Sequence, residues 1–151
     1  MAQDLELVAR RLIEEGFNRG NLDLCDELFG DELLEHQDFG PSHAPGPEGV
    51  KAVISSLRRA FPDFHLEIED LTVDGDKVWL RMVGSGTNDG SFMGNPPTGR
   101  RMRTEVFDVL RVRDGRIVEH WGVPDRLGTL FQLGLAQPPG SRAQQATTAP
   151  A

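Results

Sequence analysis

The feature that most constrains the fold is a change in the hydrophobic period of the chain after Pro62. Before this residue, apolar side chains recur at the spacing of amphipathic helices, and after it they alternate with polar ones, as in strands with one buried face. Helices followed by a run of strands indicate the α+β class. We expect a cone-shaped, distorted α+β barrel, in which a curved antiparallel sheet wraps around the N-terminal helices and leaves an internal pocket.

The helical part is expected to contain three segments. Apolar residues from Leu5 to Phe17 predict a helix over about residues 2–19. A short helix around Cys25 follows, and Pro47 suits the first turn of a third helix. The Gly- and Pro-rich sequence EHQDFGPSHAPGPEG between the last two helices predicts a loop.

The strand part is typical of two hairpins. The runs HLEIEDLTV and KVWLRMVGSGT are joined by a turn at Gly75. Residues 101–113 and 116–123 are joined by a tight turn at Asp114-Gly115. Asp125 then caps a last helix.

Length and composition favour one globular domain over residues 1–135. Residues 136–151 are small, polar and Pro-containing, which predicts a disordered tail. The 24 acidic and 16 basic residues give a charge of −8, which argues against a nucleic-acid partner. The single Cys25 excludes an internal disulfide framework and is expected in a buried helix position.

We expect no membrane partner, because no apolar run approaches the roughly 20 residues that span a bilayer. The N-terminal sequence MAQDLELVARRLIEE lacks the apolar core of a secretory signal. These features predict a cytoplasmic protein.

The second hairpin predicts which side chains face the interior. The even positions of 101–113 are apolar or uncharged except Asp108, so they form the inner face. A three-residue turn with a bulge at Gly115 pairs Asp108 with Gly122 and places His120 on the same face. A two-residue turn moves His120 to the other face.

Asp108 and His120 are the first candidates for catalysis, since a carboxylate and an imidazole are costly to bury unless paired or used. Such a pair suits proton removal next to a carbonyl. The alternative is a hydrogen-bonded pair that only holds the strands in register. His36 is a candidate second proton donor or a loop histidine, and Asp125 is a helix cap that is also a catalytic candidate.

We expect no cofactor and no metal. A site built from His36, Asp38 and His120 is geometrically possible, but the histidines lack a metal-binding spacing such as His-Glu-x-x-His. The Gly-rich run 84–99 is a hairpin lid rather than a phosphate loop. A small-molecule substrate is expected to contact a set of apolar side chains: Phe17, Phe61, Leu80, Met82, Phe92, Met93, Val106 and Leu110.

The outer sheet face is expected to carry Trp79, Val83, Phe107 and Trp121. This is a large apolar surface for solvent alone to cover, and it predicts a homodimer interface.

A set of sequence motifs resembles the SnoaL-like polyketide cyclases, within the nuclear-transport-factor-2-like or ketosteroid-isomerase-like cone fold. The resemblance covers roughly residues 5–135. It rests on GPEGVKA, AFPDFHLEIEDL, GDKV, FMGNPPTGRR, DGRIVEHW and PDRLGTLFQLG. It implies a commonly dimeric barrel with a deep apolar pocket, which closes a ring of an aromatic polyketide by intramolecular aldol condensation without cofactor or metal.

The resemblance also shows a rearrangement of acid/base groups. The family's catalytic Asp falls on Gly122, and the histidine of its preceding strand falls on Asp108, whereas His120 is kept. Two alternatives stay open: a hydroxylase component of anthracycline-type biosynthesis, as in some relatives, and a non-catalytic ligand-binding dimer. Epoxide hydrolysis on this fold needs an Asp-Arg-Asp set, for which no inward arginine is predicted.

Overall fold

The computed structural model describes residues 1–140, so most of the predicted tail lies outside the described residues. The elements follow in the order α1 (Ala2–Arg11), the π-helix η1 (Leu12–Phe17), α2 (Leu24–Leu28), β1 (Phe29–Glu35), α3 (Gly46–Ala60), β2 (His65–Asp74), β3 (Lys77–Thr87), β4 (Arg101–Arg113), β5 (Arg116–Pro124) and α4 (Arg126–Gln132). The α+β class is confirmed.

The sheet has five strands in the order β1-β5-β4-β3-β2. The pairs among β2 to β5 are antiparallel, whereas β1 pairs with β5 in parallel. The expected antiparallel sheet thus has an additional parallel edge strand, β1, at residues where the sequence predicted only a short helix and a loop. The short strand β1, FGDELLE, mixes acidic and apolar residues without a regular alternation, and its partner is far away in the sequence, so no local pattern indicates it.

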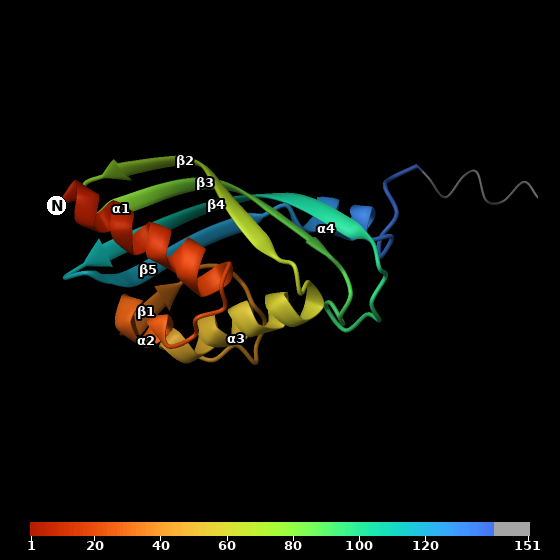
Figure 1. Cartoon of the computed structure of the whole chain (residues 1–151), viewed down its shortest axis with the longest axis horizontal. Helices are drawn as coiled ribbons and strands as arrows, with labels where there is room; N and C mark the ends of the chain where they lie inside the picture. The colour runs from red at the N-terminus through yellow and green to blue at the C-terminus, as the bar shows by residue number, and fades with distance from the viewer. Residues whose placement is uncertain (141–151) are drawn as a thin grey trace, which may run out of the picture.

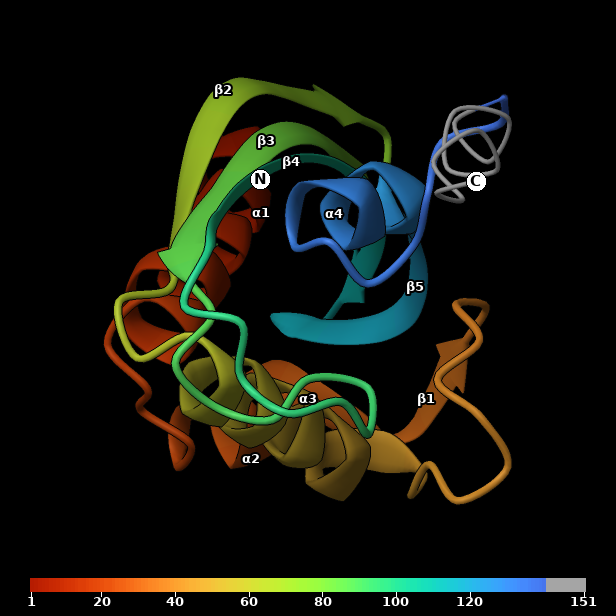
Figure 2. The ribbon, with the colours of Figure 1, turned by 90° about the vertical axis from the view of Figure 1, so that its right-hand side faces the viewer.

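Figure 1 shows the helices α1, α2 and α3 on one side of the sheet. Viewed from the end, the sheet bends into an arch, with α4 inside one end and α2 and α3 across the opening (Figure 2). The expected cone is thus closed by helices from both ends of the chain. Within the described residues, no helix is long and apolar enough to cross a membrane.

The N-terminal helix is divided where the prediction had one continuous helix. After η1, the side chain of Asn18 accepts from the backbone N–H of Leu66 at 2.7 Å and donates to its carbonyl at 2.9 Å. Arg58 of α3 donates to the carbonyl oxygens of Phe17 and Asn18. The end of the helix is therefore fixed to both β2 and α3.

The core between sheet and helices is apolar. Ile13, Ile54, Phe61, Met82 and Leu110 are fully buried and come from helices and strands alike. Burial of such side chains contributes about 1.5–3 kcal/mol each, which makes this layer the main source of stability.

The turn between β4 and β5 has two residues, because Arg113 pairs with Arg116. Asp114 and Gly115 both have positive φ, 50° and 74°, as a tight hairpin turn of this length requires. The predicted three-residue turn is wrong. A bulge at Val118 restores the register, so the predicted pairing of Asp108 with Gly122 is nevertheless confirmed.

The segment between β3 and β4 is anchored by Asn88, which is completely buried. Its side chain donates to the carbonyl of Gly90 at 2.8 Å and accepts from the backbone and hydroxyl of Thr98 at 3.0 and 2.9 Å. Phe92 packs edge-on against Phe61, with ring centroids 5.2 Å apart. The hairpin lid is therefore held at its base and in contact with the core.

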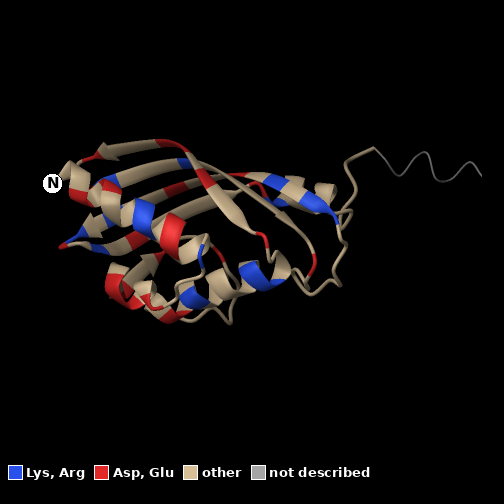
Figure 3. Ribbon diagram, viewed as in Figure 1, with Lys and Arg blue, Asp and Glu red and all other residues tan. Residues whose placement is uncertain are grey.

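The outer sheet face carries exposed aromatic residues. Trp79 and Phe107 are 50% and 52% exposed, and Val123 is 70% exposed. Val83, which was expected on this surface, is only 8% exposed and does not contribute to it. Figure 3 shows basic and acidic positions interspersed along the helices and strands of the described residues.

Candidate active site

A cavity of about 800 Å³ lies between the sheet and the helices. Six of the eight predicted substrate contacts line it: Phe17, Phe61, Phe92, Met93, Val106 and Leu110. Leu80 and Met82 do not line the cavity and are buried in the core beside it. From α4, Arg126 and Thr129 contribute to the wall.

Three ionisable side chains meet in the cavity wall: Glu35 of β1, His120 of β5 and Asp108 of β4. The Nδ1 atom of His120 lies 2.7 and 2.8 Å from the two carboxylate oxygens of Glu35. The Nε2 atom of His120 lies 3.5 Å from Oδ2 of Asp108. The imidazole is therefore held between two carboxylates, tightly on one side and loosely on the other.

Strand pairing produces this cluster. Glu35 pairs with His120 across the parallel β1–β5 contact, and Leu110 pairs with His120 across β4–β5. Asp108 lies two positions from Leu110, so its side chain points to the same face. Side chains from three adjacent strands thus converge at one point of the inner face.

The cluster is largely removed from solvent, with side-chain exposures of 13% for His120, 15% for Glu35 and 17% for Asp108. Burial by itself disfavours the charged imidazole. The hydrogen bonds and charges of Asp108 and Glu35 outweigh burial and raise the pKa of His120 to about 9. At neutral pH His120 is therefore a buried imidazolium.

Gly122 leaves room for this cluster. A Cβ atom at this position would lie 2.8 Å from both Oδ1 of Asp108 and Cε1 of His120, and it would also overlap the side-chain oxygen of Gln37. The backbone N–H of Gln37 donates to Oε1 of Glu35 at 2.8 Å, and its side chain lines the cavity. Gln37 is thus a fourth polar group at the same point.

His36 lies on the opposite side of the sheet from the cavity. Its Nε2 atom is 2.8 Å from Oε1 of Glu119, and its ring stacks on Trp121 at 4.7 Å. Hydrogen bonds from His36 and Arg111 lower the pKa of Glu119. His36 therefore contacts outer-face residues, and the suggested metal set with His120 does not come together.

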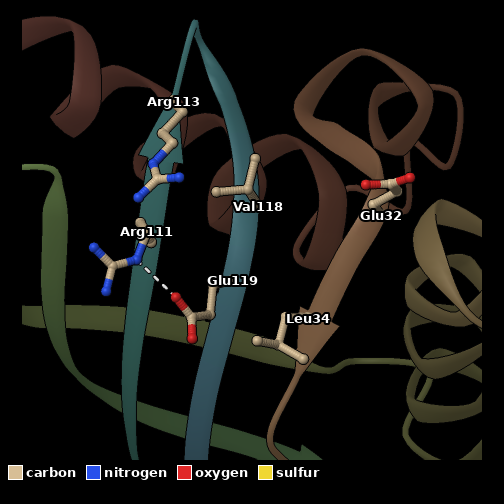
Figure 4. Close-up of a pocket in the computed structure, with 6 residues that line it drawn as sticks. All are labelled: Glu32, Leu34, Arg111, Arg113, Val118 and Glu119. Atoms are coloured by element: carbon tan, nitrogen blue, oxygen red, sulfur yellow. Dashed lines mark hydrogen bonds and ion pairs between the residues drawn. The ribbon is translucent and has the colours of Figure 1, made fainter.

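Figure 4 shows this outer side, where Arg111 and Glu119 form an ion pair beside Leu34 of β1. Even-numbered side chains of β1 line this shallow surface pocket, whereas Glu35 lines the cavity. The alternation separates His36 from His120.

Asp125 caps α4, as predicted. Its carboxylate accepts from the backbone N–H of Gly128 at 2.9 Å, and it does not line the cavity. Cys25 is buried, and burial raises the pKa of its thiol to about 11, so it stays protonated. The part of the chain that the structure describes holds no cluster of three or more His, Cys, Asp or Glu side chains suited to a metal ion.

Glu35 and Gln37 were not predicted as site residues. In the folded chain Leu33, Glu35 and Gln37 are half-buried and their even-numbered neighbours are exposed, an alternation that the apolar pattern of the sequence does not show. The run is dominated by charged and helix-favouring residues, which hid the alternation.

Comparison with known proteins identifies the family of the chain. The sequence model of a family described as SnoaL-like polyketide cyclase matches residues 7–133. The chain belongs to the SnoaL-like polyketide cyclase family. The resemblance noted in the sequence is thereby confirmed.

Individual known proteins are similar to this chain over most of their length. The aklanonic acid methyl ester cyclase DnrD of Streptomyces peucetius is 35% identical over 138 residues, which are 89% of this chain and 92% of the relative. IdmH, a putative polyketide cyclase from Streptomyces antibioticus, is 37% identical with a TM-score of 0.73, over 86% of this chain and 98% of that one. TsrD from Streptomyces laurentii superposes with a TM-score of 0.82 at 29% identity, over 90% and 98% of the two chains.

Proposed function

We propose that this protein is a cofactor-independent cyclase that closes a ring of an aromatic polyketide by intramolecular aldol condensation. The observation that carries the proposal is the cluster of Glu35, His120 and Asp108 in the wall of a largely apolar cavity. The membership of the SnoaL-like family supports the same reaction class.

The proposed reaction needs one base and one group that stabilises an oxyanion. Asp108 removes a proton from a carbon next to a carbonyl, and the electron pair of the C–H bond moves to the carbonyl oxygen as an enolate. The enolate carbon attacks a second carbonyl of the same molecule. Asp108 then returns its proton to the resulting alkoxide, so that the product is an isomer of the substrate and the enzyme is regenerated.

His120 supplies positive charge where the oxyanions form. Its Nε2 atom lies 3.5 Å from Oδ2 of Asp108, a longer contact than the one to Glu35, and both His120 and Asp108 line the cavity. A charged donor fixed in place before the reaction stabilises an oxyanion more than water does, because no reorganisation is needed.

The proposed substrate is a flat polyketide ester. A volume of about 800 Å³ is within the range of pockets that hold drug-sized ligands, and Phe17, Phe61 and Phe92 supply aromatic walls. The similar DnrD protein is named for aklanonic acid methyl ester, which makes this ester the first compound to test.

The first prediction is that purified protein converts aklanonic acid methyl ester to a ring-closed isomer without oxygen or reductant. Asp108→Asn and His120→Ala should each lower kcat/KM by about 100-fold or more, because each removes one of the two reacting groups. Asp114→Asn, at the exposed β4–β5 turn, is the matched control and should keep full activity.

The alternatives are distinguished by analysing the products with liquid chromatography and mass spectrometry. An oxygenated product that appears only with oxygen and a reductase would favour the hydroxylase component. Tight ester binding without any product would favour the non-catalytic ligand-binding dimer.

We further propose a homodimer formed through the outer sheet face, where Trp79, Phe107 and Val123 expose apolar area. A contiguous apolar surface of this kind is typical of an interaction site. We also propose that the protein is cytoplasmic, as the sequence predicts.

A further inference from the structure

The contacts of His120 with its two carboxylates are unequal. Both oxygens of Glu35 lie within 2.8 Å of Nδ1, whereas Asp108 approaches Nε2 only to 3.5 Å. Glu35 is also fixed from behind by the backbone N–H of Gln37 at 2.8 Å. One carboxylate is therefore held tightly against the imidazole, and the other makes a longer contact with it from the cavity wall.

The charges change during the proposed reaction. When Asp108 accepts a proton from the substrate it becomes neutral, and its attraction for the imidazolium is lost. Glu35 then remains as the one carboxylate within hydrogen-bond distance of His120. Without Glu35, a buried imidazolium would have no fixed counter-charge at the moment when the enolate forms.

We propose that Glu35 is a positioning residue that keeps His120 positively charged throughout the reaction, so that Asp108 alone transfers the proton and His120 stabilises the oxyanion. This inference rests on the proposed cyclase function. The two ring nitrogens of His120 then have different roles. Nδ1 is hydrogen-bonded to Glu35, and the Nε2–H faces the reacting oxygen.

Other charged groups near the cavity are too few to replace Glu35. Asp38, His43 and Arg126 line the same cavity, but the charged side chains that influence His120 are Asp108 from β4 and Glu35 from β1. On the outer side of β5, Glu119 is engaged by His36 and Arg111. Glu119 is therefore a neighbouring glutamate that serves as a matched control.

The first test follows the protonation of His120 directly by imidazole ¹H–¹⁵N NMR in the free protein. In Glu35→Gln the titration midpoint of His120 should fall by about one pH unit or more from its wild-type value, because one of two carboxylates is removed. Glu119→Gln should leave the midpoint in place. Glu35→Asp, which keeps the charge, should give a midpoint nearer to the wild type than Glu35→Gln does.

The second test uses the pH dependence of turnover with aklanonic acid methyl ester. Wild-type activity should fall above about pH 9, where His120 loses its proton. In Glu35→Gln this upper limb should move to lower pH by the same amount as the NMR midpoint. For a shift of about one pH unit, kcat should fall about 2-fold at pH 8 and about 10-fold at pH 10, and KM should change less than about 3-fold.

The two readouts separate the possible failures. If the His120 midpoint is the same in Glu35→Gln and Glu119→Gln, the inference is overturned whatever the activity. A fallen midpoint without any change in the pH limb would show that Glu35 is merely structural, which also overturns it. If neither the wild type nor any variant turns over the ester, the cyclase proposal fails, and the catalytic role of Glu35 fails with it. A lower His120 midpoint in Glu35→Gln would then still establish the charge pair between Glu35 and His120.

Discussion

Gly122 is the residue that makes the arrangement of acid/base groups possible. Its missing side chain leaves the space that Asp108, His120 and Gln37 share. In the family resemblance this position carries the catalytic aspartate, so the glycine and the carboxylate at position 108 are two parts of one rearrangement. In the proposed mechanism the base therefore lies on β4, at Asp108, instead of on β5, and Asp108 lines the cavity.

Gly122→Ala should therefore damage the site more than the fold. The added methyl group pushes on Gln37, Asp108 and His120, and we expect about a 10-fold or larger loss of kcat/KM with about 1–3 kcal/mol lost from the free energy of unfolding. Gly30→Ala is the control, because its Cβ meets its nearest neighbour, Val118, at an ordinary 3.6 Å. Wild-type turnover by Gly122→Ala would contradict this account.

The sequence alone predicted two of the three residues in the Glu35–His120–Asp108 cluster. Asp108 stood out because it is a charged residue on an otherwise apolar face, and His120 followed from the hairpin register. Glu35 could not be found this way, because a glutamate in a polar run carries no signal until its strand partner is known. A contact between residues 85 positions apart is a property of the folded chain.

At the scale of elements, the helices and the four antiparallel strands follow from local patterns, whereas β1 does not. Antiparallel neighbours are joined by short turns, so periodicity and turn residues locate them together. The parallel strand β1 depends on a partner at the other end of the chain. The turn between β4 and β5 illustrates a compensation, since an unexpected bulge at Val118 cancels an unexpected turn length.

The lid between β3 and β4 should depend on Asn88. Replacing it by Ala removes the side-chain partner of the Gly90 carbonyl and of the Thr98 backbone N–H in a partly buried environment. We expect the free energy of unfolding to fall by about 2–4 kcal/mol, measured by chemical denaturation.

Asn95→Ala, at the tip of the same segment, is the matched control for this prediction. Asn95 is less buried than Asn88, and its side chain donates to the nearby carbonyl oxygens of Phe92 and Met93. Its loss should stay below about 1 kcal/mol. Equal effects of the two variants would show that the lid is not held at its base.

At the scale of the whole molecule, the two sides of the sheet have different roles. The inner side and the helices enclose the cavity, and the outer side presents Trp79 and Phe107 to its surroundings. The order of helices and strands predicted this layering. The size of the cavity and the polar groups that line it depend on the curvature of the whole sheet. This curvature cannot be predicted from any short segment of the sequence.

Phe107→Glu should dissociate the proposed dimer, because it buries a charge in an apolar contact and should cost about 2 kcal/mol or more of association free energy. Light scattering after size exclusion gives the mass directly. Leu127→Glu changes an equally exposed apolar residue on α4 and should leave the mass unchanged. A wild-type monomer at all concentrations would remove the proposal.

The parallel contact between β1 and β5 has a consequence for the order in which the site is assembled. Asp108 and His120 share one hairpin and can meet early in folding, but Glu35 reaches them only when the amino-terminal edge strand docks. The same strand lies at the edge of the sheet, where local opening costs less than global unfolding. Amide exchange along β1 would thus report the lifetime of the competent site, separately from that of the folded protein.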